Sequence, residues 1–327
     1  MSEKLFDPFE QLLFYRNICF LTGKKLNPEH IQYVSAFPTW LLERYQISNR
    51  YILMIEENRI KYKDMVLPAS AEVVEAFNEL DKKTQEAFEG GFETMNQLPD
   101  LVIFQWMARV LYGVLYQEFI HTMGKHAMEE KDFKLSDLMK TKFRYLLYML
   151  QSVLYPTQFK DFSPWSIVRY RSKISKDILN YKDETRKLNF CLGMKDFGII
   201  ACLQDNGEVL KYNKHIVEKI GDTVLHPIQF EELYGRFMYA NYLLKDNPKY
   251  IITEEDNQIT YELPADTPKA IFETWDDETY SKVLASLWGP WGIQKEEIYE
   301  FPNSPLSYLY NEAKNTLIDP EKIKLPF

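Results

Sequence analysis

The most regular hydrophobic pattern in the chain begins after Pro68. Apolar or small residues recur there every three to four positions, at Val73, Phe77, Leu80, Thr84 and Ala87 or Phe88. That spacing is typical of a helix with one buried face. Ser70 is placed to cap its start and Gly90-Gly91 to end it. The pattern predicts a long amphipathic helix over residues 70–91.

Further helices follow at intervals along the chain. Leu101–Ile120 opens after Pro99-Asp100, which favours a helix start. Leu135–Tyr155 has a helical period and is closed by Pro156. His226-Pro227 leads into a helix over about Ile228–Leu244, and His226 is expected to cap this helix or to pack at its corner.

Strands are expected between these helices. Ser166–Arg171 and Lys187–Met194 are rich in strand-forming residues. The strongest hairpin signal joins Gly198–Leu203 to Val209–Tyr212 through Asp205-Asn206-Gly207. Cys191, in the predicted strand Lys187–Met194, and Cys202, in the predicted strand Gly198–Leu203, are expected to be buried thiols.

The segment before Pro68 mixes short elements. We expect a helix over Phe37–Tyr45, and strands over Arg50–Ile55 and Arg59–Val66 joined by Glu56-Glu57-Asn58. With a turn at Cys19 they make a small treble-clef-like module. The region after 246 carries scattered prolines and acidic runs, which suits an irregular α+β cap. The chain is therefore predicted to be α+β in three parts: a module over 1–68, a helix-rich domain with a β-hairpin over 69–245, and an acidic cap over 246–327.

Composition narrows the class of protein. The 327 residues are 46% hydrophobic, enough for a substantial core. Three widely spaced cysteines argue against a disulfide framework and fit a reducing cytosol. The first residues, MSEKLFDPFEQ, lack the pattern of a signal peptide. The apolar stretch Leu101–Ile120 contains Arg109 and Glu118, so it reads as a buried helix and not as a membrane span. We expect a cytoplasmic protein.

Charge is distributed unevenly. The chain carries a net charge of −9; residues 246–327 hold 16 acidic against 7 basic residues, and residues 1–68 hold 8 against 9. An acidic chain without a basic stripe is poorly suited to general nucleic-acid binding. The acidic region also contains Trp275, Trp288 and Trp291, and an exposed tryptophan there would indicate a protein partner.

Candidate chemistry begins at Cys19-Phe20-Leu21-Thr22-Gly23. A Cys, two residues, a second ligand and a Gly is how a zinc knuckle starts, but Thr22 is a poor zinc ligand and the next Cys is Cys191. One thiolate does not hold a structural zinc, so we expect neither metal nor cofactor and a buried Cys19. Packing must then stabilise the module, through Phe20, Leu21, Phe37, Trp40 and Leu41.

Several landmarks together carry a resemblance. They are Cys19 to Gly23, Glu29-His30, Phe37-Pro38-Thr39-Trp40-Leu41-Leu42, Gln105-Trp106, Phe162-Ser163-Pro164-Trp165-Ser166-Ile167 and Leu225-His226-Pro227-Ile228-Gln229-Phe230. In this order the chain resembles a group of bacterial HNH-endonuclease-like proteins. In that group a zinc-knuckle HNH module precedes a large helical and β domain.

The departures from that group fall where its chemistry lies. The resemblance implies a second cysteine pair near Ser70 and Val73 and an asparagine near Val74. Of the implied constellation Cys19, Glu29 and His30 remain. HNH nucleases use a histidine to deprotonate water and a divalent cation to stabilise the phosphate charge. His30, with Glu29, is therefore the catalytic candidate that the resemblance implies.

Three functions stay open at this point. The leading interpretation is a non-catalytic relative of HNH endonucleases with a binding or regulatory role and an unknown partner. The first alternative is an active metal-dependent nuclease that rebuilt its site around Glu29 and His30. The second is a protein-interaction module using the acidic, aromatic C-terminal region. Nucleic acid as a partner follows from the resemblance alone.

Overall fold

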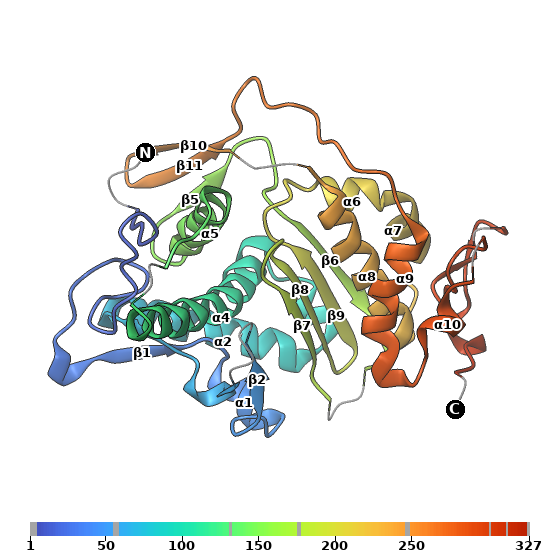
Figure 1. Ribbon diagram of the computed structural model, residues 1–327, viewed down its shortest axis with the longest axis horizontal. Helices are drawn as coiled ribbons and strands as arrows, with labels where there is room; N and C mark the ends of the chain where they lie inside the picture. The colour runs from blue at the N-terminus through green and yellow to red at the C-terminus, as the bar shows by residue number, and fades with distance from the viewer. Residues whose placement is uncertain are drawn as a thin grey trace. The chain divides into compact units, whose positions relative to one another are not determined.

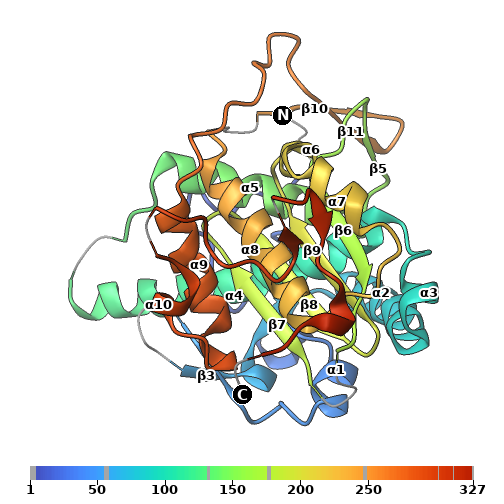
Figure 2. The same ribbon diagram turned by 90° about the vertical axis from the view of Figure 1, so that its right-hand side faces the viewer.

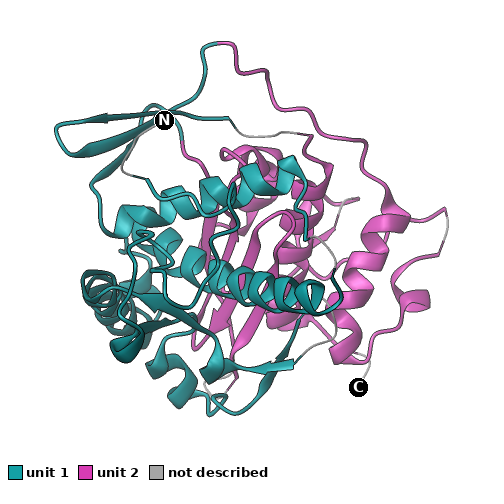
Figure 3. Cartoon of the chain, turned by 60° about the vertical axis from the view of Figure 1, so that its left-hand side comes forward, with its two compact units in different colours: residues 1–162, 249–265 teal, residues 163–248, 266–327 magenta. Residues whose placement is uncertain are grey.

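The computed structural model describes residues 5–54, 59–130, 133–174, 178–245, 249–300, 302–311 and 313–325. The fold is mixed α+β, as predicted, with several small sheets and many helices. The chain forms two compact units, Met1–Phe162 with Lys249–Ala265, and Ser163–Pro248 with Asp266–Phe327 (Figure 3). We call these unit 1 and unit 2. Their boundaries differ from the segment ends expected at residues 68 and 245, because the N-terminal residues pack with the helices that follow them.

Unit 1 is mainly helical (Figure 1). Its helices are α1 (Thr39–Arg44), α2 (Ala71–Gly90), α3 (Phe92–Met95), α4 (Asp100–Met128) and α5 (Asp137–Leu150), with 3₁₀ turns at Pro28–His30, Tyr62–Asp64 and Gln151–Val153. Its strands form the antiparallel pairs β1 (Gln32–Ser35) with β4 (Val66–Ala69) and β2 (Tyr51–Leu53) with β3 (Arg59–Lys61), and a sheet of β10 (Ile251–Glu255), β11 (Gln258–Glu262) and β5 (Thr157–Phe159).

The predicted amphipathic helix is confirmed as α2. It follows Ser70 and ends at Gly90, and every residue of the predicted apolar stripe is buried. The apolar stretch 101–120 lies within the longer α4, where Arg109 is fully buried. Arg109 Nη1 lies 2.7 Å from Asp81 Oδ1 of α2, so a buried charge is paired between the two helices. Among the described residues, no helix combines the length and apolar character that a membrane span needs.

The predicted hairpin before Pro68 is correct in part. β2 and β3 pair antiparallel, with Ile52 opposite Ile60. The second strand ends at Lys61, however, and Val66–Ala69 pairs with Gln32–Ser35 instead. Leu67 is buried opposite Val34 there, so apolar burial draws this segment into the core. The turn Glu56-Glu57-Asn58 lies outside the described residues.

Unit 2 is built on a four-stranded antiparallel sheet in the order β6-β9-β8-β7. Its elements are β6 (Ser166–Arg171), β7 (Asn180–Glu184), β8 (Asn189–Met194), β9 (Phe197–Cys202), α6 (Glu208–Tyr212), α7 (Lys214–Ile220), α8 (Pro227–Leu243), α9 (Asp277–Trp288), α10 (Lys295–Ile298), the two-residue strands β12 (Tyr310–Asn311) and β13 (Thr316–Leu317), and 3₁₀ turns at Gly289–Trp291 and Pro320–Lys322. α8 crosses one face of the sheet (Figure 2). Cys191 and Cys202 are fully buried in the core that it covers, as predicted.

The first turn of α8 and the strands beneath it explain this packing. His226 caps the helix by accepting a hydrogen bond from the Ile228 N–H at 3.2 Å, which confirms its predicted role. A Cβ at Gly198 would overlap the ring of Phe230, so the missing side chain lets α8 approach β9 closely.

The hairpin predicted across Asp205-Asn206-Gly207 is wrong. β9 pairs with β8 and β6, and the residues after Gly207 form α6. The buried Asp205 carboxylate accepts hydrogen bonds from the N–H groups of Ser166 (2.7 Å) and Val209 (2.8 Å). Gly207 is left-handed, with φ of 73°. The Asp205 carboxylate thus binds an N–H group in the first turn of α6, so the residues after it begin a helix and not the second strand of a hairpin.

The acidic region after 246 is less irregular than expected. Its first part, β10 and β11, belongs to unit 1, and the remainder contributes α9 and α10 to unit 2. Trp288 is fully buried, and Trp275 and Trp291 are partly buried.

Candidate functional site

The turn around Cys19 has a tight, knuckle-like shape. Ile18 and Lys25 form an antiparallel bridge across it. Within the turn, the Gly23 N–H donates to the Cys19 carbonyl at 2.9 Å. Gly23 is left-handed, with φ of 68°, and a Cβ there would overlap the Phe6 ring. The sequence Cys19-x-x-Thr22-Gly23 thus folds as the turn that its glycine predicts. We call residues 18–25 the knuckle.

The knuckle lies against the start of α2. Cys19 Sγ is 3.6 Å from Ser70 Oγ, and the Phe20 N–H donates to the Pro68 carbonyl at 2.8 Å. Lys24 pairs with Glu72 in the first turn of the helix. Val73, in the first turn of α2, is fully buried. Within the described ranges, no three His, Cys, Asp or Glu side chains gather as they would to hold a metal.

Glu29 and His30 lie on the 3₁₀ turn between the knuckle and β1. Asn27 caps this turn, since its side chain accepts the Glu29 N–H at 3.1 Å and its carbonyl accepts the His30 N–H at 3.0 Å. Both candidate side chains are exposed. The structure therefore presents the catalytic candidates at the surface of a short turn.

Packing of the knuckle follows the prediction with one exception. Phe20 is buried between Phe77 and Tyr112, with ring centroids 5.9 Å away on each side. Leu21, Phe37 and Leu41 are also buried. Trp40 is partly buried and meets Phe88 edge to face at 6.2 Å. Burial of Phe20 and its neighbours therefore contributes more than burial of Trp40.

A second candidate site is a cavity of about 860 Å³ in unit 2. Its walls come from α6 to α9 and from residues 304–311 and 313–318, which we call the strap. Aromatic and charged side chains line it, among them Tyr212, Arg236, Trp275, Asp277, Tyr280 and Tyr310. Of these residues, the sequence had singled out Trp275, as part of a possible partner surface in the acidic C-terminal region.

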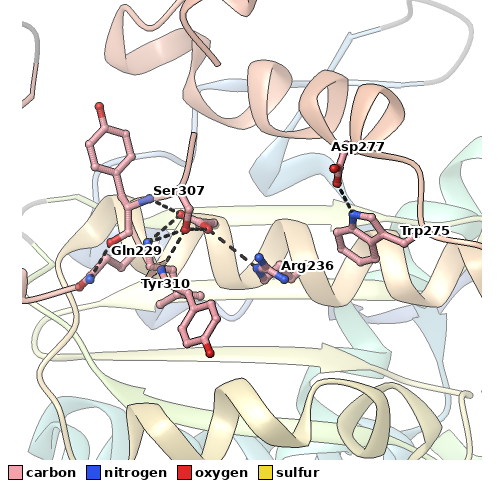
Figure 4. A network of polar contacts seen from close by, with 9 residues as sticks. Gln229, Arg236, Trp275, Asp277, Ser307 and Tyr310 are labelled. Carbon is pink, nitrogen blue, oxygen red and sulfur yellow. Dashed lines mark hydrogen bonds and ion pairs between the residues drawn. The ribbon is translucent and has the colours of Figure 1, made fainter. Parts of the chain in front are cut away.

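Two buried side chains of α8 attach the strap (Figure 4). Glu232 is fully buried and accepts hydrogen bonds from the Ser307 hydroxyl (2.6 Å) and from the N–H groups of Tyr308 (2.7 Å) and Leu309 (2.9 Å). The Gln229 amide donates to the carbonyls of Tyr308 and Ile318 at 2.9 and 2.8 Å. Burial raises the pKa of Glu232, and Arg236 and the strap donors act in the opposite direction. The strap is a fixed wall of the cavity.

Arg236 follows Glu232 by one helical turn and lies at the wall of the cavity. Its Nε is 3.8 Å from Glu232 Oε1. Its guanidinium carbon is 5.7 Å from the ring centroid of Trp275 and 5.5 Å from that of Tyr280. The Trp275 Nε1–H donates to Asp277 Oδ1 at 3.1 Å, which orients the indole. The cavity therefore has a cation supported by two aromatic rings.

The signal that could have indicated this site is the pair Glu232 and Arg236. They stand four residues apart inside a predicted apolar helix, where charged residues are rarely buried without a partner. The strap residues that complete the site lie about 70 residues further along the chain, with separations of 75 to 77 positions for the Glu232 bonds.

No protein-family model matches the chain, and neither a curated protein nor a solved structure matches it. Its function must therefore be argued from the two sites themselves.

Proposed function

We propose that this chain is a non-catalytic relative of the HNH endonucleases, with a binding or regulatory role, in which packing has replaced a metal centre. The observation that supports this is the contact of Cys19 Sγ with Ser70 Oγ at 3.6 Å. The sequence resemblance places a first ligand pair at Cys19 and Thr22 and a second at Ser70 and Val73. A metal shared by those pairs would lie between the knuckle and the first turn of α2.

The side chains at those four positions suit packing better than coordination. Structural zinc takes four ligands from thiolates, imidazoles and carboxylates. Here one thiol meets a hydroxyl, Val73 is buried among apolar residues, and Thr22 accepts the Lys24 N–H at 3.4 Å. Phe20, buried between two aromatic rings, supplies stabilisation of the kind that a metal would otherwise give.

The nuclease alternative requires a base and a cation at one phosphate. Glu29 and His30 are exposed on a three-residue turn, so a rebuilt site would have to form at the surface. The protein-interaction alternative relied on exposed tryptophans. Trp288 is buried, and the indole N–H groups of Trp275 and Trp291 donate to Asp277 and Glu231. These observations favour the non-catalytic relative.

Restoring the thiols tests the proposal. The triple variant Thr22→Cys, Ser70→Cys, Val73→Cys would join Cys19 in a four-thiol set. If the two pairs converge, the purified variant will hold one zinc per chain, and a chelator will lower its melting temperature. The matched control is Thr22→Ser, Ser70→Ala, Val73→Ala, which changes the same positions without adding thiols. Elemental analysis of both variants and of the parent gives the readout.

A folded triple variant with no more zinc than its control would disprove the convergence and with it the HNH relationship. Stoichiometric zinc in the parent, with a melting temperature sensitive to chelator, would disprove the replacement of metal by packing. Plasmid cleavage in Mg²⁺ or Mn²⁺ is expected to stay at background. Cleavage that is lost in a folded His30→Ala variant would establish the nuclease alternative instead.

A further inference from the structure

The cavity of unit 2 has the size and rigidity of a ligand site. Its volume of about 860 Å³ lies within the roughly 300–1,000 Å³ common for small-molecule pockets. One of its walls, the strap, is held to α8 by Glu232 and Gln229 through five hydrogen bonds of 2.6 to 2.9 Å. A pocket held in this way loses little entropy when it binds a ligand.

The cavity's cation is suited to a planar anion. Arg236 is 12% exposed at its side chain and lines the cavity. A guanidinium offers parallel N–H donors that match a carboxylate in a bidentate pair. Glu232 lies behind it at 3.8 Å and directs its shorter hydrogen bonds to the strap. The rings of Trp275 and Tyr280 support the guanidinium and restrict its orientation.

The walls are suited to a flat ring. Tyr212 and Trp275 both line the cavity, with planes 14° apart and centroids 6.4 Å apart. Tyr280 and Tyr310 add further aromatic surface. Aromatic side chains pack well against planar rings in offset or edge-to-face geometry.

The charge of the lining limits the ligand's charge. Arg236 and Asp277 both line the cavity, and Glu232 lies 3.8 Å from Arg236 Nε, so the one guanidinium of the lining is accompanied by two carboxylates. A phosphate monoester carries nearly two negative charges at neutral pH. A single carboxylate can form a bidentate pair with the guanidinium and meets less repulsion from Asp277 and Glu232 than a phosphate does. We propose that this cavity binds a small monocarboxylate that carries a planar ring, a role that is independent of the HNH relationship.

Calorimetric titration of the full chain tests the proposal. The probe is 2-naphthoate, a planar bicyclic monocarboxylate. Its controls are 2-naphthamide, which has the same ring without charge, cyclohexanecarboxylate, which has the charge without a planar ring, and 2-naphthyl phosphate. We expect 2-naphthoate to bind at least about tenfold more tightly than 2-naphthamide, since a hydrogen-bonded charge is worth that much. It should also bind more tightly than cyclohexanecarboxylate, which lacks the aromatic ring, and than 2-naphthyl phosphate, which carries a second charge.

Two variants connect binding to the cavity. Arg236→Gln should weaken 2-naphthoate at least about tenfold, whereas Arg186→Gln should leave its affinity within about twofold. Arg186 is exposed in the β7–β8 turn and does not line the cavity, so it is a matched control. Tyr212→Leu should weaken binding about fivefold through lost ring contact, and it keeps the test valid if Arg236→Gln does not fold.

Several results would overturn the proposal. They are no binding of 2-naphthoate at millimolar concentration, equal binding of 2-naphthamide or cyclohexanecarboxylate, and unchanged affinity in folded Arg236→Gln and Tyr212→Leu. Tighter binding of 2-naphthyl phosphate than of 2-naphthoate would make this a phosphate site and would likewise overturn it. None of these results bears on zinc in the triple-cysteine variant.

Discussion

The knuckle in unit 1 and the cavity in unit 2 relate motif to structure in opposite ways. The knuckle has a recognisable motif, yet Cys19 lies against the Ser70 hydroxyl at the start of α2, and Val73 is buried there. The cavity has no motif, yet it brings Arg236, Asp277 and four aromatic rings around about 860 Å³. A short motif is formed by residues that are neighbours in the chain, whereas a cavity lined by charges depends on elements that are far apart in the sequence. The two regions should therefore respond differently to substitution.

The largest effect is expected in the knuckle. Phe20→Ala should destabilise the protein by about 3–5 kcal/mol, because it removes a buried ring between Phe77 and Tyr112. Cys19→Ala should cost about 1 kcal/mol, since it removes one small buried side chain. Urea unfolding of both variants and the parent measures this difference. If Cys19→Ala proved as damaging as Phe20→Ala, Cys19 would have to bind something more than its packing neighbours, and the contrast between the two regions would fail.

The cavity's wall should be next in sensitivity. Glu232→Ala leaves the Ser307 hydroxyl and the N–H groups of Tyr308 and Leu309 without their acceptor. We expect a loss of about 3 kcal/mol, as for other broken buried charge networks. Limited proteolysis should then cut the strap. Glu232→Gln, which keeps an acceptor and the shape, is the matched variant and should retain most of the protection; equal cleavage in both would mean that Glu232 does not hold the strap.

The smallest effect concerns pH and the Asp205 carboxylate of unit 2. Burial raises the pKa of Asp205 to about 6, above its ordinary value of 3.8, so the folded state binds a proton more readily than the unfolded state. Its contribution to stability is therefore fully present at low pH and is lost as pH rises through 6. Between pH 7 and pH 5 this gives a gain of about 1 kcal/mol from this group.

Comparing the pH profiles of the parent and Asp205→Asn isolates that contribution. The difference in unfolding free energy between pH 5 and pH 7 should be about 1 kcal/mol smaller in the variant. Parallel profiles would show that the Asp205 carboxylate does not titrate in this range in the folded protein.

Sequence patterns predicted an element correctly where a single helix face or a single capping residue determines its structure. The buried stripe of α2 and the cap at His226 depend on neighbours in the chain, and both were predicted. The hairpin at Asp205 failed because its carboxylate binds Ser166, 39 residues earlier in the chain. The second strand before Pro68 is shorter than predicted, because Val66–Ala69 pairs with Gln32–Ser35, where Leu67 is buried opposite Val34. Such contacts between residues distant in the sequence override the local secondary-structure propensity.

The same distinction applies to the sites. Cys19 and Ser70 could be associated from the sequence because a resemblance supplied their pairing. The cavity could not, because it needs α8 and the strap to meet, and the Glu232 bonds to the strap span at least 75 positions. Glu232 and Arg236 could be recognised in the sequence as charges in an apolar helix. The neighbouring sequence, however, does not indicate which residues pair with them.

Unit 1 is made of two separate chain segments, Met1–Phe162 and Lys249–Ala265, and this has a consequence for how the protein folds during synthesis. β5 ends at Phe159, and the strand that pairs with it, β11, begins at Gln258, after the chain has passed through much of unit 2. Tyr261 of β11 is fully buried and packs on Phe159 with ring centroids 5.1 Å apart. During translation the ribosome therefore delivers the N-terminal helices long before their last strand. Until then the nascent chain exposes the edge of β5, which makes this interval the time when a chaperone or a neighbouring chain has access to it.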